Sequence, residues 1–260
     1  MNIIVLLKQV PDLTQLAGPA DGPRMLEADA PKVVNPWDEY ALETAIQLKE
    51  VHGGQVTGLT VGPPQAVEAL RTALAMGLDQ AVLISDPALT RIDSLVTARL
   101  LAAGIGKLGH YDLIVGGRAS IDAAASATAV QVAALLDLPV ISYVAELKSV
   151  DPAMASLMAI RLLENGRQRV SSRLPALITV VKEINEPRYP SFMGLRQAKK
   201  AIIPTWTLAD LGLEAGQLKA RVSWQVSAAP SREARLEMLQ GPPAEAAATL
   251  ADRLIDDQVI

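Results

Sequence analysis

The 260-residue sequence contains no cysteine and only two histidines. The absence of cysteine excludes disulfide bonds, thiolate nucleophiles and cysteine-ligated zinc or iron–sulfur clusters. His52 and His110 are far apart, and each falls near the end of a predicted helix, so we interpret both as surface or helix-terminal residues. A histidine-based metal site or a Ser-His-Asp triad is therefore not expected, and we predict no metal site and no catalytic residue.

Aromatic residues make up only 3% of the chain, and its formal net charge is -4. Surfaces that bind nucleic acid combine basic side chains with aromatic stacking platforms, so nucleic acid is not an expected partner. With 50% hydrophobic and 20% charged residues, the composition predicts a soluble globular protein with a full core.

Long uninterrupted apolar runs are also lacking. The most apolar stretch, residues 123–145, is interrupted by Gln131, Asp137 and Pro139, so it does not supply the roughly 20 apolar residues of a membrane span. The N-terminus lacks the basic flank and cleavage site of a signal peptide. We therefore expect a cytoplasmic protein without a membrane span.

Short apolar segments alternate with amphipathic ones along the first half of the chain. Residues 11–31 are rich in Pro, Gly and Asp and predict a long loop or a small hairpin. Asn35 is expected to cap a helix that Pro36 opens and Gly53 ends. The expected strands span residues 3–7, 56–61, 81–85 and 112–115, and further helices span residues 64–76, 93–107 and 122–136. This alternation predicts an α/β fold with a Rossmann-like, doubly wound parallel sheet covered on both faces.

Beyond Pro139 the pattern changes to consecutive strands. Strands are expected at residues 140–149, 155–163, 167–173 and 177–181. The Asn165-Gly166 pair between two extended runs favours a type I′ hairpin. A helix is expected at residues 193–201.

The final stretch, residues 204–260, has helical patterns only at residues 231–239 and 244–254. Its apolar periodicity is too weak to build a core of its own. We interpret residues 1–203 as a nucleotide-binding α/β domain and residues 204–260 as an arm that packs on a partner subunit. The alternative is that this stretch folds back on the same chain.

A glycine pattern at residues 104–109 matches G-x-G-x-x-G, the dinucleotide-binding motif. That motif requires a strand before it and a helix after it, whereas these glycines end a helix and lead into a strand, so we interpret them as a helix stop.

The loop at residues 116–122 is a stronger candidate for a nucleotide site. It leaves a strand and enters a predicted helix, its glycines let backbone amides approach an anion, and Ser126 and Thr128 offer hydroxyls. Residues 8–12 and 35–38 are expected at the same edge of the sheet. The alternative interpretation is a tight strand-to-helix turn with a well-capped helix nearby.

Phe192 is the only phenylalanine, and it lies in a polar turn with Arg196, Lys199 and Lys200 just after it. A core role would place it in a periodic apolar stripe. We interpret Phe192 as an exposed anchor for a partner's pocket, with ordinary packing as the alternative.

Taken together, these motifs resemble the β subunit of electron transfer flavoproteins over nearly the whole chain. The matching segments are residues 8–12, 34–43 and 71–77, the Gly-Gly loop that begins at Gly116-Gly117, the hairpin at 161–179, and residues 185–190 and 198–200. The resemblance implies a Rossmann-like fold of the adenine nucleotide α hydrolase-like type with a C-terminal arm. It also implies a heterodimer with an α subunit that holds most of the FAD, and AMP as a structural nucleotide in the β subunit.

By position, the resemblance implies the site residues. The nucleotide shell maps to Leu6, Asn35, Pro36, Trp37, Asp38, Val61, Gly117, Arg118, Ala119, Ser120, Ile121, Asp122, Ser126 and Thr128. A partner-recognition loop maps to residues 185–200, with docking residues Tyr189, Phe192, Met193 and Leu195. Phe192 stands where the family usually has an aliphatic anchor, and residues 123–127 are alanine-rich where the family often has acidic and amide residues.

The implied role is that of an electron carrier subunit rather than an enzyme. Electrons would pass from dehydrogenases, such as acyl-CoA dehydrogenases, through FAD to a quinone oxidoreductase. Two alternatives stay open: an electron-bifurcating subunit that binds a second FAD and uses NADH, and a stand-alone adenine-nucleotide-binding domain.

Overall fold

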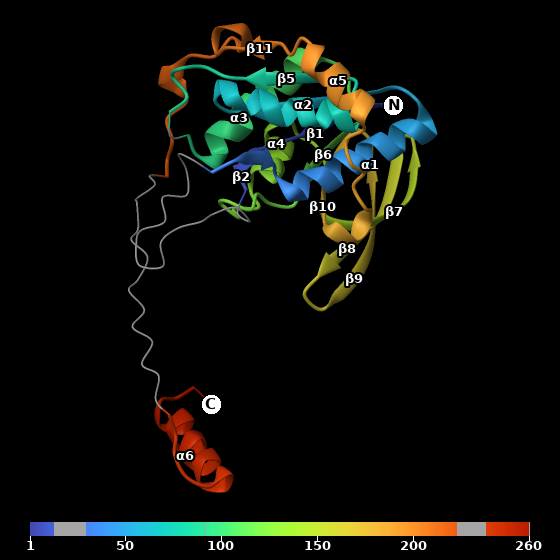
Figure 1. Ribbon diagram of the computed structural model, residues 1–260. Helices are drawn as coiled ribbons and strands as arrows, with labels where there is room; N and C mark the ends of the chain where they lie inside the picture. The colour runs from blue at the N-terminus through green and yellow to red at the C-terminus, as the bar shows by residue number, and fades with distance from the viewer. Residues whose placement is uncertain (13–29, 91, 223–237, 260) are drawn as a thin grey trace. The chain divides into compact units, whose positions relative to one another are not determined.

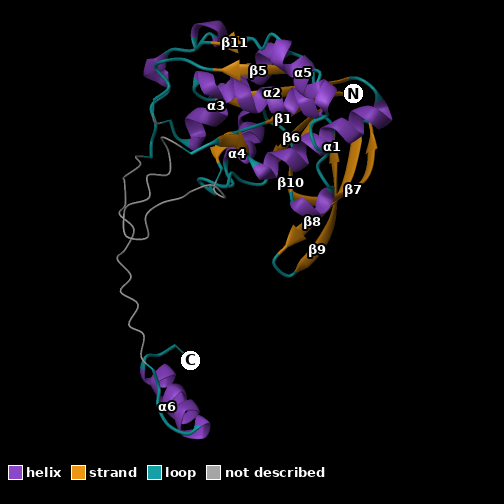
Figure 2. Cartoon of the chain, in the orientation of Figure 1, coloured by secondary structure: helices purple, strands orange, loops and turns teal. Residues whose placement is uncertain are grey.

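A computed structural model describes residues 1–12, 30–90, 92–222 and 238–259. The chain divides into two compact units. The first comprises Met1–Ala17 and Met25–Val226, and the second comprises Gly18–Arg24 and Ser227–Ile260. Figure 1 shows the first unit as a sheet with helices packed on it, and Figure 2 shows the same elements by type.

The first unit is built on a nine-stranded sheet in the order β11-β5-β4-β1-β6-β10-β7-β8-β9. The strands from β11 to β7 pair in parallel, and the pairs β7–β8 and β8–β9 are antiparallel. Their bounds are β1 (Asn2–Leu6), β4 (Gln55–Val61), β5 (Gln80–Ile84), β6 (Leu113–Gly117), β7 (Val140–Asp151), β8 (Ser156–Leu163), β9 (Gly166–Arg173), β10 (Ala176–Val180) and β11 (Thr205–Trp206).

Helices cover both faces of the parallel part of the sheet. On one face, α1 (Pro36–His52) and α2 (Val67–Met76) pack against alternate residues of β1 such as Ile3 and Val5. On the other face, α3 (Ser94–Leu108) and α4 (Thr128–Leu135) pack against Ile4 and Leu6. Because successive strand residues point to opposite faces, β1 is buried on both sides. The predicted Rossmann-like, doubly wound fold is confirmed.

Two features of the first unit add to this core, and the second unit contains a helix. The short strands β2 (Gln9–Pro11) and β3 (Lys32–Val34) pair in antiparallel fashion at the ends of the predicted loop at residues 11–31. Residues 13–29 of that loop lie outside the described residues. Helix α5 (Phe192–Lys200) packs on α2, and the second unit contains α6 (Pro243–Asp256).

The predicted helix at residues 122–136 begins six residues later than expected, at Thr128. Ala124 and Ser126 have φ angles of 50° and 51°, in the left-handed region. Such residues cannot continue a right-handed helix, and the preceding Ile121 amide donates to a side chain instead of entering a helix. Residues 118–127 therefore form an extended loop at the sheet edge.

The turn between β8 and β9 also differs from the predicted type I′ geometry. That turn needs positive φ at both central residues, but neither Glu164 nor Asn165 has one. Gly166 carries the positive φ, at 143°. The hairpin itself is confirmed, with Leu163 paired to Gly166.

The start of the predicted arm belongs to the first unit. Thr205–Trp206 adds β11 to the edge of the sheet beside β5, and Leu208 is buried in the core. The first unit thus extends past the predicted boundary at residue 204, to Val226. The predicted helix at residues 244–254 corresponds to α6, whereas most of the predicted helical pattern at residues 231–239 lies outside the described residues.

Across the part of the chain that the structure describes, no helix combines the length and apolarity needed to cross a membrane.

Candidate functional site

The carboxyl ends of the central strands define the candidate site. Strand order runs outward from β1 to β4 and β5 in one direction, and from β6 to β10 in the other. Connections leave the sheet in opposite directions at such a switch point, which opens a crevice where doubly wound proteins bind ligands. Lys8 follows β1 at this edge, and Arg118 follows β6.

A buried carboxylate, that of Asp38, holds this edge together. The backbone amide of Lys8 donates to Asp38 Oδ2 at 2.7 Å, and Asn35 Nδ2 donates to Asp38 Oδ1 at 2.9 Å. The Gly117 amide donates to the same carboxylate. Asp38 therefore joins the first turn of α1 to the ends of both β1 and β6.

Burial raises the pKa of Asp38 from 3.8 to about 7. Desolvation disfavours the charged form, and hydrogen bonds from Asn35, Lys8 and Gly117 only partly offset it.

Gly117 makes this close approach possible. A Cβ atom at position 117 would overlap Oδ1 of Asp38 and would lie 2.7 Å from the carbonyl carbon of Trp37. Only a residue without a side chain lets the start of α1 rest on the end of β6. The second glycine of the Gly-Gly loop is thus explained by packing between elements.

The side chain of Asn35 fixes the loop that follows β6. Its Nδ2 donates to the Ala119 carbonyl at 2.8 Å, and its Oδ1 accepts from the Ile121 amide at 3.1 Å. Asn35 stands at the N-cap position of α1, but its side chain makes no capping hydrogen bond there, so the predicted capping role is wrong. The amide is used to hold the loop at residues 119–121.

Lys8 and Asp122 form an ion pair over this loop. Lys8 Nζ lies 2.7 and 2.6 Å from the two carboxylate oxygens of Asp122, and 3.5 Å from Ser120 Oγ. Burial raises the pKa of Asp122, but hydrogen bonds from Lys8 and Ser120 outweigh it and hold the pKa below its usual range. A cation and hydroxyl groups thus lie together at the edge.

At the end of β6, Arg118 lies near two aromatic rings. Its guanidinium carbon is 4.3 Å from the centre of the Trp37 ring and 5.8 Å from that of Tyr143. These rings and Arg118 line a cavity of about 720 Å³ that Leu162 and Lys182 also border. Arg118 Nε is buried without a hydrogen-bond partner among the described residues.

Tyr143 reaches this cavity through an irregularity in β7. The pairing of β7 with β10 shifts between Ile178 and Val180, and Tyr143 has a φ of 60°. Its amide donates to Thr179 Oγ1 at 3.1 Å. Such a bulge redirects a side chain that regular alternation would place elsewhere, which is why the sequence pattern missed Tyr143.

The structure brings most of the predicted nucleotide-shell residues to one sheet edge, but in different roles. Asn35 and Asp38 are buried and satisfied by internal hydrogen bonds, and Leu6 is buried in the core. Pro36 opens α1, and Val61 ends β4 at the same edge. Residues 119–126 form the exposed or partly exposed loop, and Thr128 opens α4. The sequence placed residues 8–12 at this edge but did not single out Lys8 as a site residue.

The predicted docking residues form a second surface. Tyr189 is 92% exposed and Phe192 is 82% exposed, and Met193 and Leu195 are also exposed. Phe192 is the first residue of α5, where Ser191 Oγ accepts from the Gly194 amide at 2.9 Å. The expected exposure of Phe192 is confirmed, and its docking role stays a prediction. Ile202, just after α5, is also 95% exposed and was not predicted.

The doubly wound sheet places the chain in the class of Rossmann-like α/β proteins. The electron transfer flavoprotein domain model matches residues 24–211. The chain is 37% identical to electron transfer flavoprotein subunit beta of Bacillus subtilis, over 98% of this chain and 97% of that protein. The chain therefore belongs to the electron transfer flavoprotein β-subunit family.

Two further relatives have different names. The chain is 38% identical to the caffeyl-CoA reductase-Etf complex subunit CarD of Acetobacterium woodii, over 100% of both chains. It is 36% identical to protein FixA of Azorhizobium caulinodans, over 82% of this chain and 78% of that protein.

Gly117→Ala is expected to destabilise the first unit by about 1–3 kcal/mol, because the added methyl group overlaps Asp38 and Trp37. Urea unfolding measures the change. Gly106→Ala is the matched control: its Cβ meets open space within α3, so the substitution should stabilise the protein by roughly 0.5–1 kcal/mol. Equal effects of the two substitutions would contradict the close packing at Gly117.

Stability should also depend on the ionisation of Asp38. The folded-state pKa lies above the unfolded value, so this carboxyl favours folding below about pH 4, and that contribution is lost as pH rises towards 7. The free energy of unfolding of the wild type minus that of Asp38→Asn should therefore fall between pH 4 and 7, by at most about 1.4 kcal/mol per pH unit. Urea titrations at pH 4, 5, 6 and 7 measure it, and a pH-independent difference would refute the raised pKa.

Proposed function

We propose that this chain is the β subunit of a heterodimeric electron transfer flavoprotein in the cytoplasm. It acts as an electron carrier subunit, accepting electrons from dehydrogenases such as acyl-CoA dehydrogenases and passing them through FAD to a quinone oxidoreductase. The exposed apolar surface on α5 carries this proposal, because the chain's only phenylalanine lies there 82% exposed. Large exposed apolar side chains grouped in this way are typical of a docking site.

The residues at the sheet edge fit a nucleotide. Lys8 and the hydroxyl of Ser120 suit a phosphate, and Ser126 and Thr128 supply further hydroxyls just before and at the start of α4. Arg118 Nε is buried and lacks a partner among the described residues, so an acceptor on a bound ligand can satisfy it.

We assign the residues of the sheet edge to two cofactors. AMP would be held at the Lys8 side by the predicted nucleotide-shell residues other than Trp37 and Arg118. The FAD, held mostly by the α subunit, supplies the electron-accepting chemistry when bound. Trp37 and Arg118, which line the cavity together with Tyr143, are the residues of this chain that we assign to it.

Helix α6 supports the heterodimer. It carries apolar side chains along its length, among them Leu250 and Ile255. A helix with one apolar face needs a surface to cover that face. We assign this surface to the α subunit, as proposed for the C-terminal arm.

A second candidate function is an electron-bifurcating β subunit that binds a second FAD in place of AMP and uses NADH. The 38% identity to a subunit of the caffeyl-CoA reductase-Etf complex supports assembly with a reductase. The alanine-rich residues 123–127 add no charged side chain that would select between the two nucleotides.

The nucleotide content of the heterodimer separates these candidates. Co-expression with the α subunit should give a yellow heterodimer that releases one FAD and one AMP on denaturation, identified by mass. Two FAD per heterodimer, with reduction by NADH, would establish the bifurcating alternative. A colourless, stable monomer that binds no flavin partner would refute both.

Phe192→Ala should lower kcat/KM for electron transfer from an acyl-CoA dehydrogenase by at least about tenfold, because a central anchor contributes roughly 2 kcal/mol or more to docking. FAD content should not change. Val51→Ala is the control, because Val51 is a similarly exposed apolar residue at the other end of α1 from the candidate site. Equal rates for Phe192→Ala and the wild type would rule out the anchor role.

A further inference from the structure

The docking surface begins on a loop, residues 185–191, that apolar burial cannot hold in place. Among residues 185–200, Ala198 alone is buried. Residues 185–191 connect a 3₁₀ turn (Lys182–Ile184) to α5 and belong to no strand or helix. A loop with few buried contacts is mobile unless polar interactions fix it. Helix α5 is held by its packing on α2. The position of Tyr189 in the preceding loop must therefore depend on hydrogen bonds and ion pairs.

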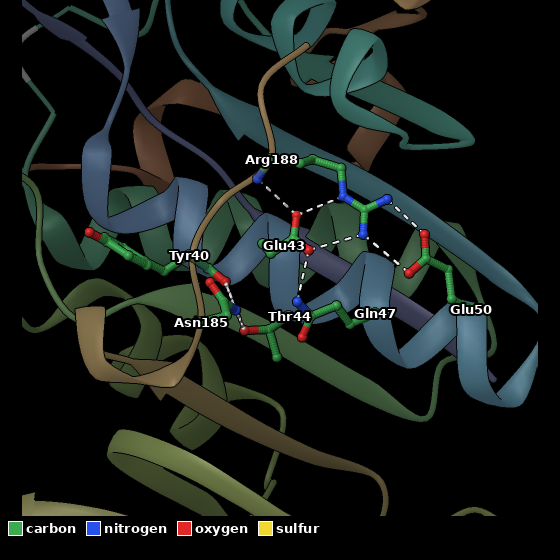
Figure 3. A network of polar contacts seen from close by, with 7 residues as sticks. All are labelled: Tyr40, Glu43, Thr44, Gln47, Glu50, Asn185 and Arg188. Atoms are coloured by element: carbon green, nitrogen blue, oxygen red, sulfur yellow. Dashed lines mark hydrogen bonds and ion pairs between the residues drawn. The ribbon is translucent and has the colours of Figure 1, made fainter. Parts of the chain in front are cut away.

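Arg188 provides most of these interactions, as Figure 3 shows. Its backbone amide and its Nε donate to Glu43 Oε2 at 3.1 and 2.8 Å, and its Nη2 donates to Glu43 Oε1 at 3.0 Å. Its Nη1 and Nη2 also donate to the two carboxylate oxygens of Glu50, at 2.7 and 3.1 Å. One guanidinium thus forms paired bonds to two carboxylates seven residues apart on α1.

The two carboxylates differ in exposure. The side chain of Glu43 is 4% exposed, whereas that of Glu50 is 54% exposed. Burial raises the pKa of Glu43, but hydrogen bonds from Arg188 and Gln47 outweigh it and hold the pKa below its usual value. Glu43 is therefore charged, and Arg188 is its cationic partner. A buried ion pair of this kind is costly to break, because removing one partner leaves an uncompensated charge.

Other polar contacts fix the two ends of the segment. Asn185 Nδ2 donates to the Tyr40 carbonyl at 3.1 Å and to Thr44 Oγ1 at 2.8 Å (Figure 3). At the other end, Arg71 Nη1 donates to the Ala198 carbonyl at 2.6 Å. Arg188 lies between these ends and is covalently adjacent to the exposed Tyr189.

We propose that Arg188 is a positioning residue for partner docking: by binding Glu43 and Glu50 together, it fixes residues 186–192 on α1 so that Tyr189 and Phe192 are presented in one orientation. This inference rests on the proposed docking function of that surface. The fork of the guanidinium is essential, because a lysine ammonium at the same position cannot form paired bonds to two carboxylates.

Hydrogen–deuterium exchange on the heterodimer tests the positioning directly. In Arg188→Lys and Arg188→Gln, amides of residues 186–195 should exchange at least about tenfold faster, because hydrogen bonds to charged groups are lost. Amides of β1 and β6 should be unchanged. Arg188→Gln combined with Glu43→Gln removes both charges and covers the case in which the single variant misfolds. Arg167→Gln, at the exposed turn of the β8–β9 hairpin, controls for net charge. Unchanged exchange in Arg188→Lys and in the double variant would overturn the proposal.

Electron transfer from a substrate-reduced acyl-CoA dehydrogenase separates this inference from the proposed function. Arg188→Lys should raise KM for the heterodimer about tenfold, with kcat and FAD content within about twofold of the wild type. If Phe192→Ala impairs transfer while Arg188→Lys leaves KM unchanged, the positioning role is wrong and the docking surface stands. If neither variant alters transfer, the docking surface fails and the positioning role fails with it.

Discussion

The buried carboxylate of Asp38 is the interaction on which the rest of the structure depends. It accepts hydrogen bonds from the backbone amides of Lys8, after β1, and Gly117, at the end of β6. These bonds fix the first turn of α1 at the point where the sheet's strand order reverses. Asn35 donates to the same carboxylate and also forms hydrogen bonds with the backbone of Ala119 and Ile121, so it fixes the loop at residues 119–121. Without a fixed start to α1, neither the loop nor the Trp37 ring beside Arg118 would have a defined position.

Helix α1 connects the sheet edge with the docking surface, because it contacts both. Its buried residues, such as Leu42 and Ile46, pack on the sheet and make the helix rigid. Glu43 and Glu50 then hold the segment that ends in the exposed Phe192. The candidate nucleotide edge and the candidate docking surface are therefore both built on one helix, although residues 35–38 and 185–192 are distant in the sequence.

Local patterns were enough to predict the core of the fold. The alternation of short apolar strands with amphipathic helices is set by residues such as Ile3–Leu7 and the buried stripe of α1, and burial on both sheet faces follows from it. What the patterns missed depends on partners far away in the chain. The sequence predicts Asn35 as a helix cap, but its side chain bonds to the backbone of Ala119 and Ile121 instead. Helix α4 starts late because Ala124 and Ser126 adopt left-handed φ angles. Tyr143 enters the cavity through a bulge in β7. Arg188 and Glu43 are 145 residues apart in the sequence, and no local pattern predicts their ion pair.

The pKa values of the two carboxyls on the buried face of α1 shift in opposite directions, because both their desolvation and their partners differ. Asp38 and Glu43 lie five residues apart, and desolvation is the largest influence on the pKa of each. Asp38 is surrounded mainly by neutral N–H donors, and its pKa is raised to about 7. Glu43 meets the guanidinium of Arg188 in paired hydrogen bonds, and its pKa is lowered. Neutral donors stabilise an anion less than a cation does. The carboxylate at the sheet edge can therefore exchange a proton near neutral pH, whereas the carboxylate beneath the docking segment stays ionised and keeps Arg188 in place.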